Sequence, residues 1–260
     1  MGIPIFSTMR TASLIFFQIL LFALPIAGGP ITIAILAGAS GGTFYGSGVD
    51  ADIRALYTRS NNSAEPASII MSPVYGPDAA ISFSSVINNS LSLSLDLWYR
   101  AKGIAYAVPG SVADSLLGVI SNRSIRIDYL TVPLRATVYL PGYSIFFPYA
   151  YAGLFGGILL DVNAITTGAR TENRYGYTGA VASTEQIPLG DYFNWYDAGV
   201  SFGVGMELGL GIRGIVANLG CEWGLVDVVN HPQNNELFTD AMRTLSIGLA
   251  VGYEIRLFRF

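Results

Sequence analysis

The chain has 260 residues, of which 52% are hydrophobic and only 12% are charged. Soluble domains usually carry about 25% charged residues, so this composition leaves too few charges to cover an ordinary water-facing surface. Lys and Arg total 14 and the net charge is -4, which argues against a nucleic-acid-binding surface. The single cysteine, Cys221, excludes an intrachain disulfide, and the single histidine, His231, argues against a histidine-based metal site. We therefore expect no metal and no cofactor, and either a very apolar interior or an outer surface that meets lipid.

The N-terminal residues have the pattern of an export signal. Residues 14–27, LIFFQILLFALPIA, form an apolar run that is preceded by Arg10 and followed by two glycines. This order of charged, apolar and small segments is typical of a signal peptide, and the run is short for a membrane-spanning helix of about 20 residues. We predict that residues 1–28 are a cleaved signal peptide and that residues 29–260 form one exported domain. An uncleaved N-terminal anchor is the alternative.

Beyond residue 30, apolar residues alternate with small or polar residues over long segments. In residues 91–102, LSLSLDLWYRAK, four leucines and Tyr99 share one face of a strand, and the serines, Asp96 and Arg100 share the other. Segments of this kind exceed the usual strand length of about five or six residues and match the roughly 9–11 residues that cross a bilayer at a tilt. A sheet in lipid must close on itself, because an open edge would leave backbone groups unpaired in hydrocarbon.

The order of strands and connections predicts the fold class. Alternation predicts strands over residues 31–39, 79–87, 91–107, 124–140, 145–162, 195–208, 212–228 and 243–258. Tight turns are predicted at Asn88-Asn89, Pro141-Gly142 and Gly209-Leu210-Gly211, and long polar connections at 40–78, 108–123, 163–194 and 229–242. We predict an all-β, closed antiparallel transmembrane β-barrel of about eight strands, with short periplasmic turns and long extracellular loops. A secreted β-sandwich is the alternative, although its strands are usually shorter.

Three stretches of the sequence resemble a known family. They are residues 128–134 (DYLTVPL), 148–153 (PYAYAG) and 245–253 (LSIGLAVGY), and they resemble the PorT-type outer-membrane β-barrel family. The resemblance implies a small barrel, of the size of the OmpA and OmpX domains, in a bacterial outer membrane. It implies little about function, although a few members of the family are linked to secretion machinery.

The C-terminus resembles the signal that outer-membrane barrels present to their assembly machinery. Such barrels often end in an aromatic residue, and this chain ends in Phe260. The internal part of the signal is matched by Gly252, Tyr253, Ile255 and Leu257, and a bulge near Leu257 would bring the terminal residue into phase. The expected partners are therefore outer-membrane lipids, the assembly machinery and possible extracellular ligands or secretion components, and no nucleic acid.

Charged residues of both signs fall on the predicted inward faces. These residues are Asp96, Arg100, Arg135, Glu207, Glu222, Glu254 and Arg256, together with Asn218. The side chains of an eight-stranded barrel roughly fill its interior, so we expect these charges to pair and to plug the lumen. A gated path for protons or ions is the alternative. On the outer face we expect Tyr99, Trp195, Tyr196 and Trp223 to lie at the membrane interface.

The sequence favours a binding or structural protein over an enzyme. His231 lies in a predicted loop and no nucleophile motif accompanies it, so we expect no catalytic residues. Loops on a rigid scaffold commonly carry recognition, so we expect residues 40–78 and 163–194 to carry surface binding. A narrow channel for small or hydrophobic solutes is the first alternative, and a surface hydrolase or acyltransferase is the second.

Overall fold

The structure is a computed structural model that describes residues 30–49, 70–107, 121–141, 145–174, 177–188, 192–229 and 241–257. Nine strands lie in these ranges: β1 (Ile31–Tyr45), β2 (Ile70–Asn88), β3 (Leu91–Ala107), β4 (Ser121–Tyr139), β5 (Phe146–Arg174), β6 (Tyr177–Pro188), β7 (Tyr196–Leu210), β8 (Arg213–Gly224) and β9 (Arg243–Arg256). Within these ranges the structure contains no helix that is long and apolar enough to cross a membrane.

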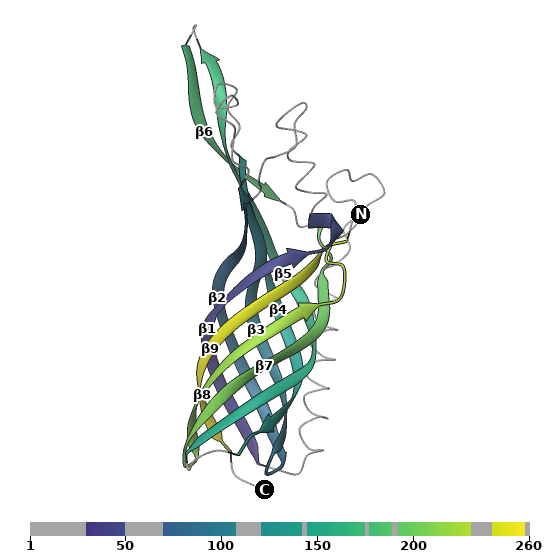
Figure 1. Cartoon of the computed structure of the whole chain (residues 1–260), viewed down its shortest axis with the longest axis vertical. Helices are drawn as coiled ribbons and strands as arrows, with labels where there is room; N and C mark the ends of the chain where they lie inside the picture. The colour runs from purple at the N-terminus through teal and green to yellow at the C-terminus, as the bar shows by residue number, and fades with distance from the viewer. Residues whose placement is uncertain are drawn as a thin grey trace.

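Eight of the nine strands close into a ring (Figure 1). Each strand is antiparallel to both neighbours, in the order β1, β2, β3, β4, β5, β7, β8 and β9, and β9 pairs back onto β1 through the register Ile35↔Tyr253. Every ring strand therefore has a partner on both sides, as a sheet in hydrocarbon requires. The predicted closed antiparallel barrel is confirmed.

The ninth strand lies outside the ring. The first half of β5 pairs with β7, whereas its second half pairs with β6 from Asn163↔Pro188 to Arg174↔Tyr177. The resulting β5–β6 hairpin projects beyond the barrel (Figure 1). The prediction of a loop over residues 163–194 was wrong here, as it was for the parts of 40–78 that belong to β1 and β2. The hairpin lies beyond the barrel, where a strand needs no lipid-facing apolar residues, so the alternation that identified the other strands is missing from it.

The short turns lie at one end of the barrel and the long connections lie at the other. The turns at Asn89-Ser90 and at Gly211-Ile212 join neighbouring strands at the end where the described chain also begins and stops (Figure 1). Gly211 has a φ of +78°, which glycine adopts without strain. In outer-membrane barrels the short turns face the periplasm. We call this end the turn side and the opposite end the loop side.

The wall is apolar outside and polar inside, the reverse of a water-soluble domain. Many large outward side chains are highly exposed, with values of 41–68% for Ile35, Leu93, Leu154, Val204, Leu219, Ile247 and Leu249. Most inward serines, threonines and charged residues are buried, such as Ser94, Asp96 and Thr131. One predicted outward residue departs from this pattern: Leu95 is buried, and its cross-strand partners are the large side chains of Phe83 and Leu134. A surface of this kind is suited to contact with lipid.

Candidate functional site

The barrel interior contains the main concentration of buried charge in the described chain. Successive residues of a strand point to opposite faces, so Asp96, Arg100 and Lys102 all project inward from β3. Their relative exposures are 1%, 6% and 0%. Charges that are buried this deeply require partners, because an uncompensated buried ion costs several kcal/mol.

Arg100 and Lys102 are held by three carboxylates from other strands. Arg100 pairs with Asp78 of β2 at 3.1 Å and with Glu222 of β8 at 3.0 Å. Lys102 pairs with Asp197 of β7 at 2.9 Å and with the second oxygen of Glu222 at 3.1 Å. Glu222 therefore joins both cations across the lumen. We call these five residues the central belt.

Hydroxyl groups complete the belt. Each carboxylate accepts a hydrogen bond from one of them: from Ser40 to Asp78 at 2.6 Å, from Thr244 to Asp197 at 2.6 Å and from Thr131 to Glu222 at 3.2 Å. The Lys102 ammonium also lies over the rings of Phe155 and Tyr129, 4.5 and 5.3 Å from their centroids. Such extra contacts help to offset the cost of removing the charges from water.

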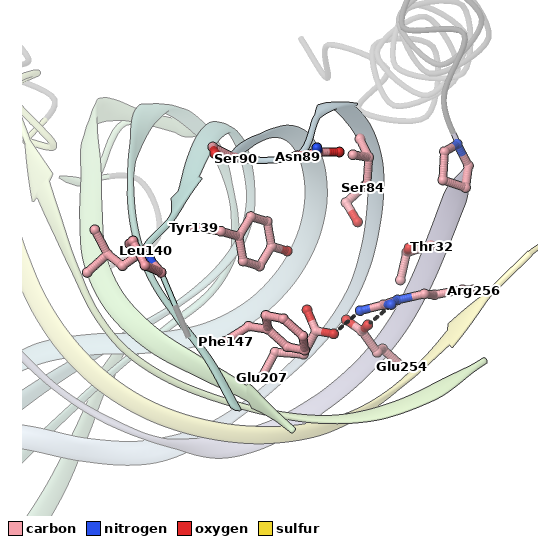
Figure 2. A pocket seen from close by; sticks show the side chains of 13 residues that line it. Thr32, Ser84, Asn89, Ser90, Tyr139, Leu140, Phe147, Glu207, Glu254 and Arg256 are labelled. Atoms are coloured by element: carbon pink, nitrogen blue, oxygen red, sulfur yellow. Dashed lines mark hydrogen bonds and ion pairs between the residues drawn. The ribbon is translucent and has the colours of Figure 1, made fainter. Parts of the chain in front are cut away.

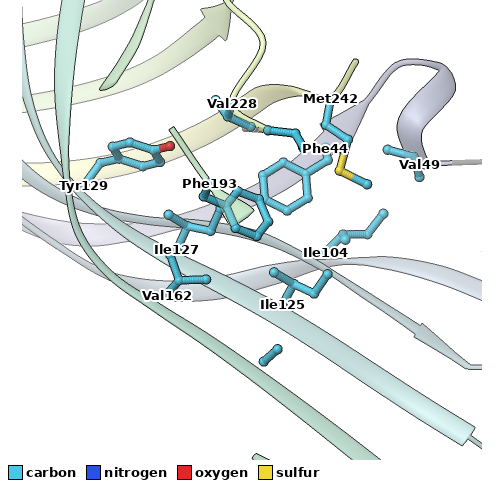
Figure 3. Close-up of a cluster of buried hydrophobic side chains, with 12 residues drawn as sticks. Phe44, Val49, Ile104, Ile125, Ile127, Tyr129, Val162, Phe193, Val228 and Met242 are labelled. Atoms are coloured by element: carbon cyan, nitrogen blue, oxygen red, sulfur yellow. The ribbon is translucent and has the colours of Figure 1, made fainter. Parts of the chain in front are cut away.

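On the loop side of the belt, the lumen is filled by an apolar cluster (Figure 3). Strand residues such as Ile104, Ile125 and Ile127 meet side chains from the connections, such as Phe193 and Val228, and every one is at most 4% exposed. The remaining members are Phe44, Val49, Tyr129, Val162, Ala164, Val229 and Met242. The interior at this end is therefore packed with apolar side chains from both the wall and the segments that cross it.

On the turn side of the belt, the interior holds two smaller charge groups. Arg135 pairs with Asp96, and its guanidinium lies over the ring of Tyr151, 4.4 Å from the centroid. Closer to the opening, Arg256 pairs with Glu207 and, at 3.4 Å, with Glu254 (Figure 2). These last three residues border a cavity of about 480 Å³ at the turn-side mouth.

All but one of the predicted lumen residues are buried in the structure. Asp96, Arg100, Arg135, Glu207, Asn218, Glu222 and Glu254 are buried, whereas the side chain of Arg256 is 41% exposed at the mouth. Two further members of the belt, Lys102 and Asp197, were not among the predicted lumen residues. Lys102 is nevertheless in phase with Arg100 along β3, and Asp197 is in phase with Glu207 along β7. Asp78 was missed because it fell in a predicted loop.

The four predicted interface aromatics lie on the outer surface or at its rim. Tyr99 and Tyr196 occupy one cross-strand row, through Leu130 and Ile158. The Tyr99 hydroxyl donates to Asp128 at 2.9 Å. Trp195 is 66% exposed beside Tyr196, with ring centroids 5.2 Å apart, and the Trp223 indole N–H donates to the Tyr45 hydroxyl.

Several predicted features lie outside the described residues. They are residues 1–28, His231 and Phe260. Of the proposed assembly signal, Gly252, Tyr253 and Ile255 belong to β9, Leu257 follows it, and Tyr253, Ile255 and Leu257 point outward with 44–45% exposure.

Comparison with solved structures finds small outer-membrane proteins. Ail, the attachment invasion locus protein of Yersinia pestis, is 10% identical, with 87% of this chain and 99% of that chain covered and a TM-score of 0.35. OprG of Pseudomonas aeruginosa is 10% identical, with 88% and 96% covered and a TM-score of 0.43. AlkL is 12% identical, with 89% and 91% covered and a TM-score of 0.44.

The family is shown by sequence. A search of curated proteins finds no match. The family model of the outer membrane protein beta-barrel domain matches residues 38–230, well over half of the chain. This match fits a closed ring of strands with an apolar outer wall and a charged interior. The protein belongs to the outer membrane protein beta-barrel domain family, whose place is the bacterial outer membrane.

Proposed function

We propose that this protein is a closed barrel that acts as a scaffold for binding at the cell surface. The observation that carries the proposal is the filled interior between the central belt and the loop-side end. Lys102, Ile104, Ile125 and Ile127 have relative exposures of 0–1%. A path for water or ions would have to pass both the ion pairs and the apolar cluster.

Opening the belt would be costly. Moving Lys102 away from Asp197 and Glu222 would leave buried charges without partners, and breaking such a pair costs about 3–5 kcal/mol. A barrier of this kind suits a permanent plug that stabilises the barrel. The predicted lumen charges are, in this proposal, structural.

The β5–β6 hairpin supplies a surface for binding. Among the described strands, β6 pairs only with β5, so its other edge has no described partner. Unpaired strand edges can accept an extended segment of another protein, which adds a strand through backbone hydrogen bonds. The projection of the hairpin beyond the barrel on the loop side fits this role (Figure 1).

Single-channel recording tests the closed interior. Wild-type protein in planar bilayers should give no reproducible conductance step, because the lumen is filled. A variant with Lys102→Ala and Ile125→Gly should give steps, and both proteins should first show the compact fast-running gel band that is lost on boiling. A reproducible step from the wild-type protein would refute the plug.

Crosslinking at the surface of intact cells tests the hairpin. A variant in which residues 169–182 are replaced by a two-residue turn should keep its heat-modifiable band and lose crosslinked neighbours. A matched control with the exposed Asp161→Asn should keep them. Unchanged crosslinking in the shortened variant would show that binding does not use the hairpin.

A narrow passage for small solutes remains the second candidate function, and one observation favours it. Two cavities extend inside the lumen from the turn-side mouth to Arg135, so part of a route for a solute is already open. The passage would need the belt and the apolar cluster to move. The conductance experiment separates the two functions.

We also infer that residues 1–28 direct export and are then cleaved, and that assembly uses the C-terminal residues ending in Phe260. N-terminal sequencing of protein from outer-membrane fractions should find a start near residue 29. Deleting Phe260 should slow the appearance of the heat-modifiable band. We further propose that four aromatic side chains lie at the membrane interface, namely those of Tyr99, Trp195, Tyr196 and Trp223.

A further inference from the structure

The turn-side half of the lumen contains two cavities that share part of their lining. The mouth cavity is about 480 Å³ and the deeper one about 50 Å³. Ser84, Tyr139, Glu207 and Glu254 line both of them. The larger volume falls within the range of about 300–1,000 Å³ that is usual for small-molecule sites.

Two buried polar groups at the deep end lack partners. Ser94 Oγ and Arg135 Nε make no hydrogen bond within the described part of the chain, and both residues line the deeper cavity. Their residues are only 6% and 8% exposed. Buried polar groups are normally hydrogen-bonded, so these two groups are available to a molecule inside the cavity.

At the turn-side mouth, two carboxylates share one cation. Glu207 and Glu254 are 3% and 7% exposed, and both rely on the single guanidinium of Arg256, whose side chain is 41% exposed (Figure 2). Two neighbouring carboxylates that share one cation repel each other, so they favour either a bound proton or a further positive group beside them. A ligand with an ammonium group would meet that need.

The rest of the lining offers hydroxyl groups and aromatic faces. Tyr139, Tyr149 and Tyr151 form a row with ring centroids 5.7 and 6.4 Å apart, from the mouth into the deeper cavity. The same two cavities are also lined by the hydroxyl-bearing residues Thr32, Ser82, Ser84, Ser92, Ser94 and Thr137. A sugar ring has an apolar C–H face that packs on an aromatic ring and hydroxyl groups that both donate and accept hydrogen bonds.

We propose that the turn-side lumen is a binding site for a small amino sugar that enters from the periplasm. Its ammonium group lies between Glu207 and Glu254, its ring packs against Tyr139, and its hydroxyls reach toward Ser94 and Arg135. The site is separate from the loop-side surface, so it stands whether or not the β5–β6 hairpin binds a partner.

Calorimetric titration of the folded protein in detergent tests the site. The probes are glucosamine, glucose and putrescine, which carry ring and charge, ring alone and charge alone. Glucosamine should bind at least about tenfold more tightly than glucose or putrescine. A hydrogen bond to a charged group contributes enough binding free energy for a difference of this size. No glucosamine binding to wild-type protein would overturn the proposal. Equal binding of putrescine would overturn the sugar class.

Two variants and one control complete the test. Glu207→Gln should reduce glucosamine affinity about tenfold and remove the preference over glucose, because the buried charge is lost. Ser84→Phe should abolish binding by filling the space that both cavities share, without changing any charge. Asp161→Asn, an exposed carboxylate on the loop side, should bind as wild type does. Unchanged affinity in both folded variants would refute the site.

Discussion

The two halves of the barrel interior are built on the same strands and are filled in different ways. On the loop side, the belt and the apolar cluster leave Lys102, Ile125 and Ile127 fully buried. On the turn side, a cavity of about 480 Å³ opens beside Arg256, whose side chain is 41% exposed. One half resembles the core of a folded domain and the other half resembles a binding cleft.

The difference is a matter of side-chain volume. The eight-stranded ring sets one interior width, which side chains of ordinary size roughly fill. Along β3 the inward residues change from Ser92 and Ser94 near the turn to Lys102 and Ile104 near the loops. Small residues leave space that the backbone cannot close. Substitutions on the loop side should therefore lower the stability of the barrel strongly, and substitutions on the turn side should lower it only weakly.

The largest expected effect comes from Lys102→Met. The substitution keeps a similar volume and leaves Asp197 and Glu222 buried without their ammonium partner, which should lower the free energy of unfolding by about 3–5 kcal/mol. Urea unfolding of the protein folded in lipid vesicles measures the change. The control is Arg213→Met, which removes an exposed cation at the turn. Equal stability of the two variants would show that the belt does not hold the barrel together.

Ile125→Ala tests the apolar cluster. Truncating this fully buried side chain should cost roughly 3 kcal/mol, since the cavity left behind cannot collapse. The matched control is Ile35→Ala, at a position 68% exposed on the outer wall, where lipid tails can fill the space. The same unfolding measurement applies. A larger loss at Ile35 would reverse the proposed contrast between a packed interior and a lipid-wetted exterior.

Thr131→Val measures the contribution of one hydroxyl to the belt. The Thr131 hydroxyl donates to Glu222 at 3.2 Å and is fully buried. A hydrogen bond to a charged group contributes about 1.5–3 kcal/mol, so the variant should lose an amount near the lower end of that range. Full wild-type stability would mean that the two cations alone satisfy Glu222.

The sequence was most informative where the strands meet lipid. The strand predicted over residues 91–107 matches the bounds of β3, because exposed outward residues such as Leu93 alternate with buried inward residues such as Asp96. The same reasoning failed for the ends of β1 and β2 near Ser40 and Asp78, where glycines and prolines interrupt the apolar residues. It also failed for β6 and the distal part of β5, which rise beyond the apolar wall. Solvent imposes no alternation on such segments.

The sequence predicts which residues face the interior, but it does not predict which of them pair with one another. Period two places Arg100, Lys102 and Glu222 inward, yet which charges meet depends on the strand register and on side-chain length. Asp78 could not be found, because the sequence around it lacks alternation and β2 is irregular between Pro73 and Asp78. The apolar cluster was also missed, since Phe193 and Val228 come from connections whose path over the lumen no periodicity encodes.

The smallest expected effect comes from Ser84→Ala, the turn-side counterpart of Thr131→Val. Ser84 is half-buried and borders the mouth cavity, where water can replace the lost hydroxyl, so stability should change by no more than about 0.5 kcal/mol. The same unfolding measurement in vesicles provides the comparison with Thr131→Val. If removing either hydroxyl costs the same, the turn-side half is as tightly packed as the belt. If only Thr131 matters, the stability of the barrel interior resides on the loop side, and the turn side is free to keep its space for a ligand.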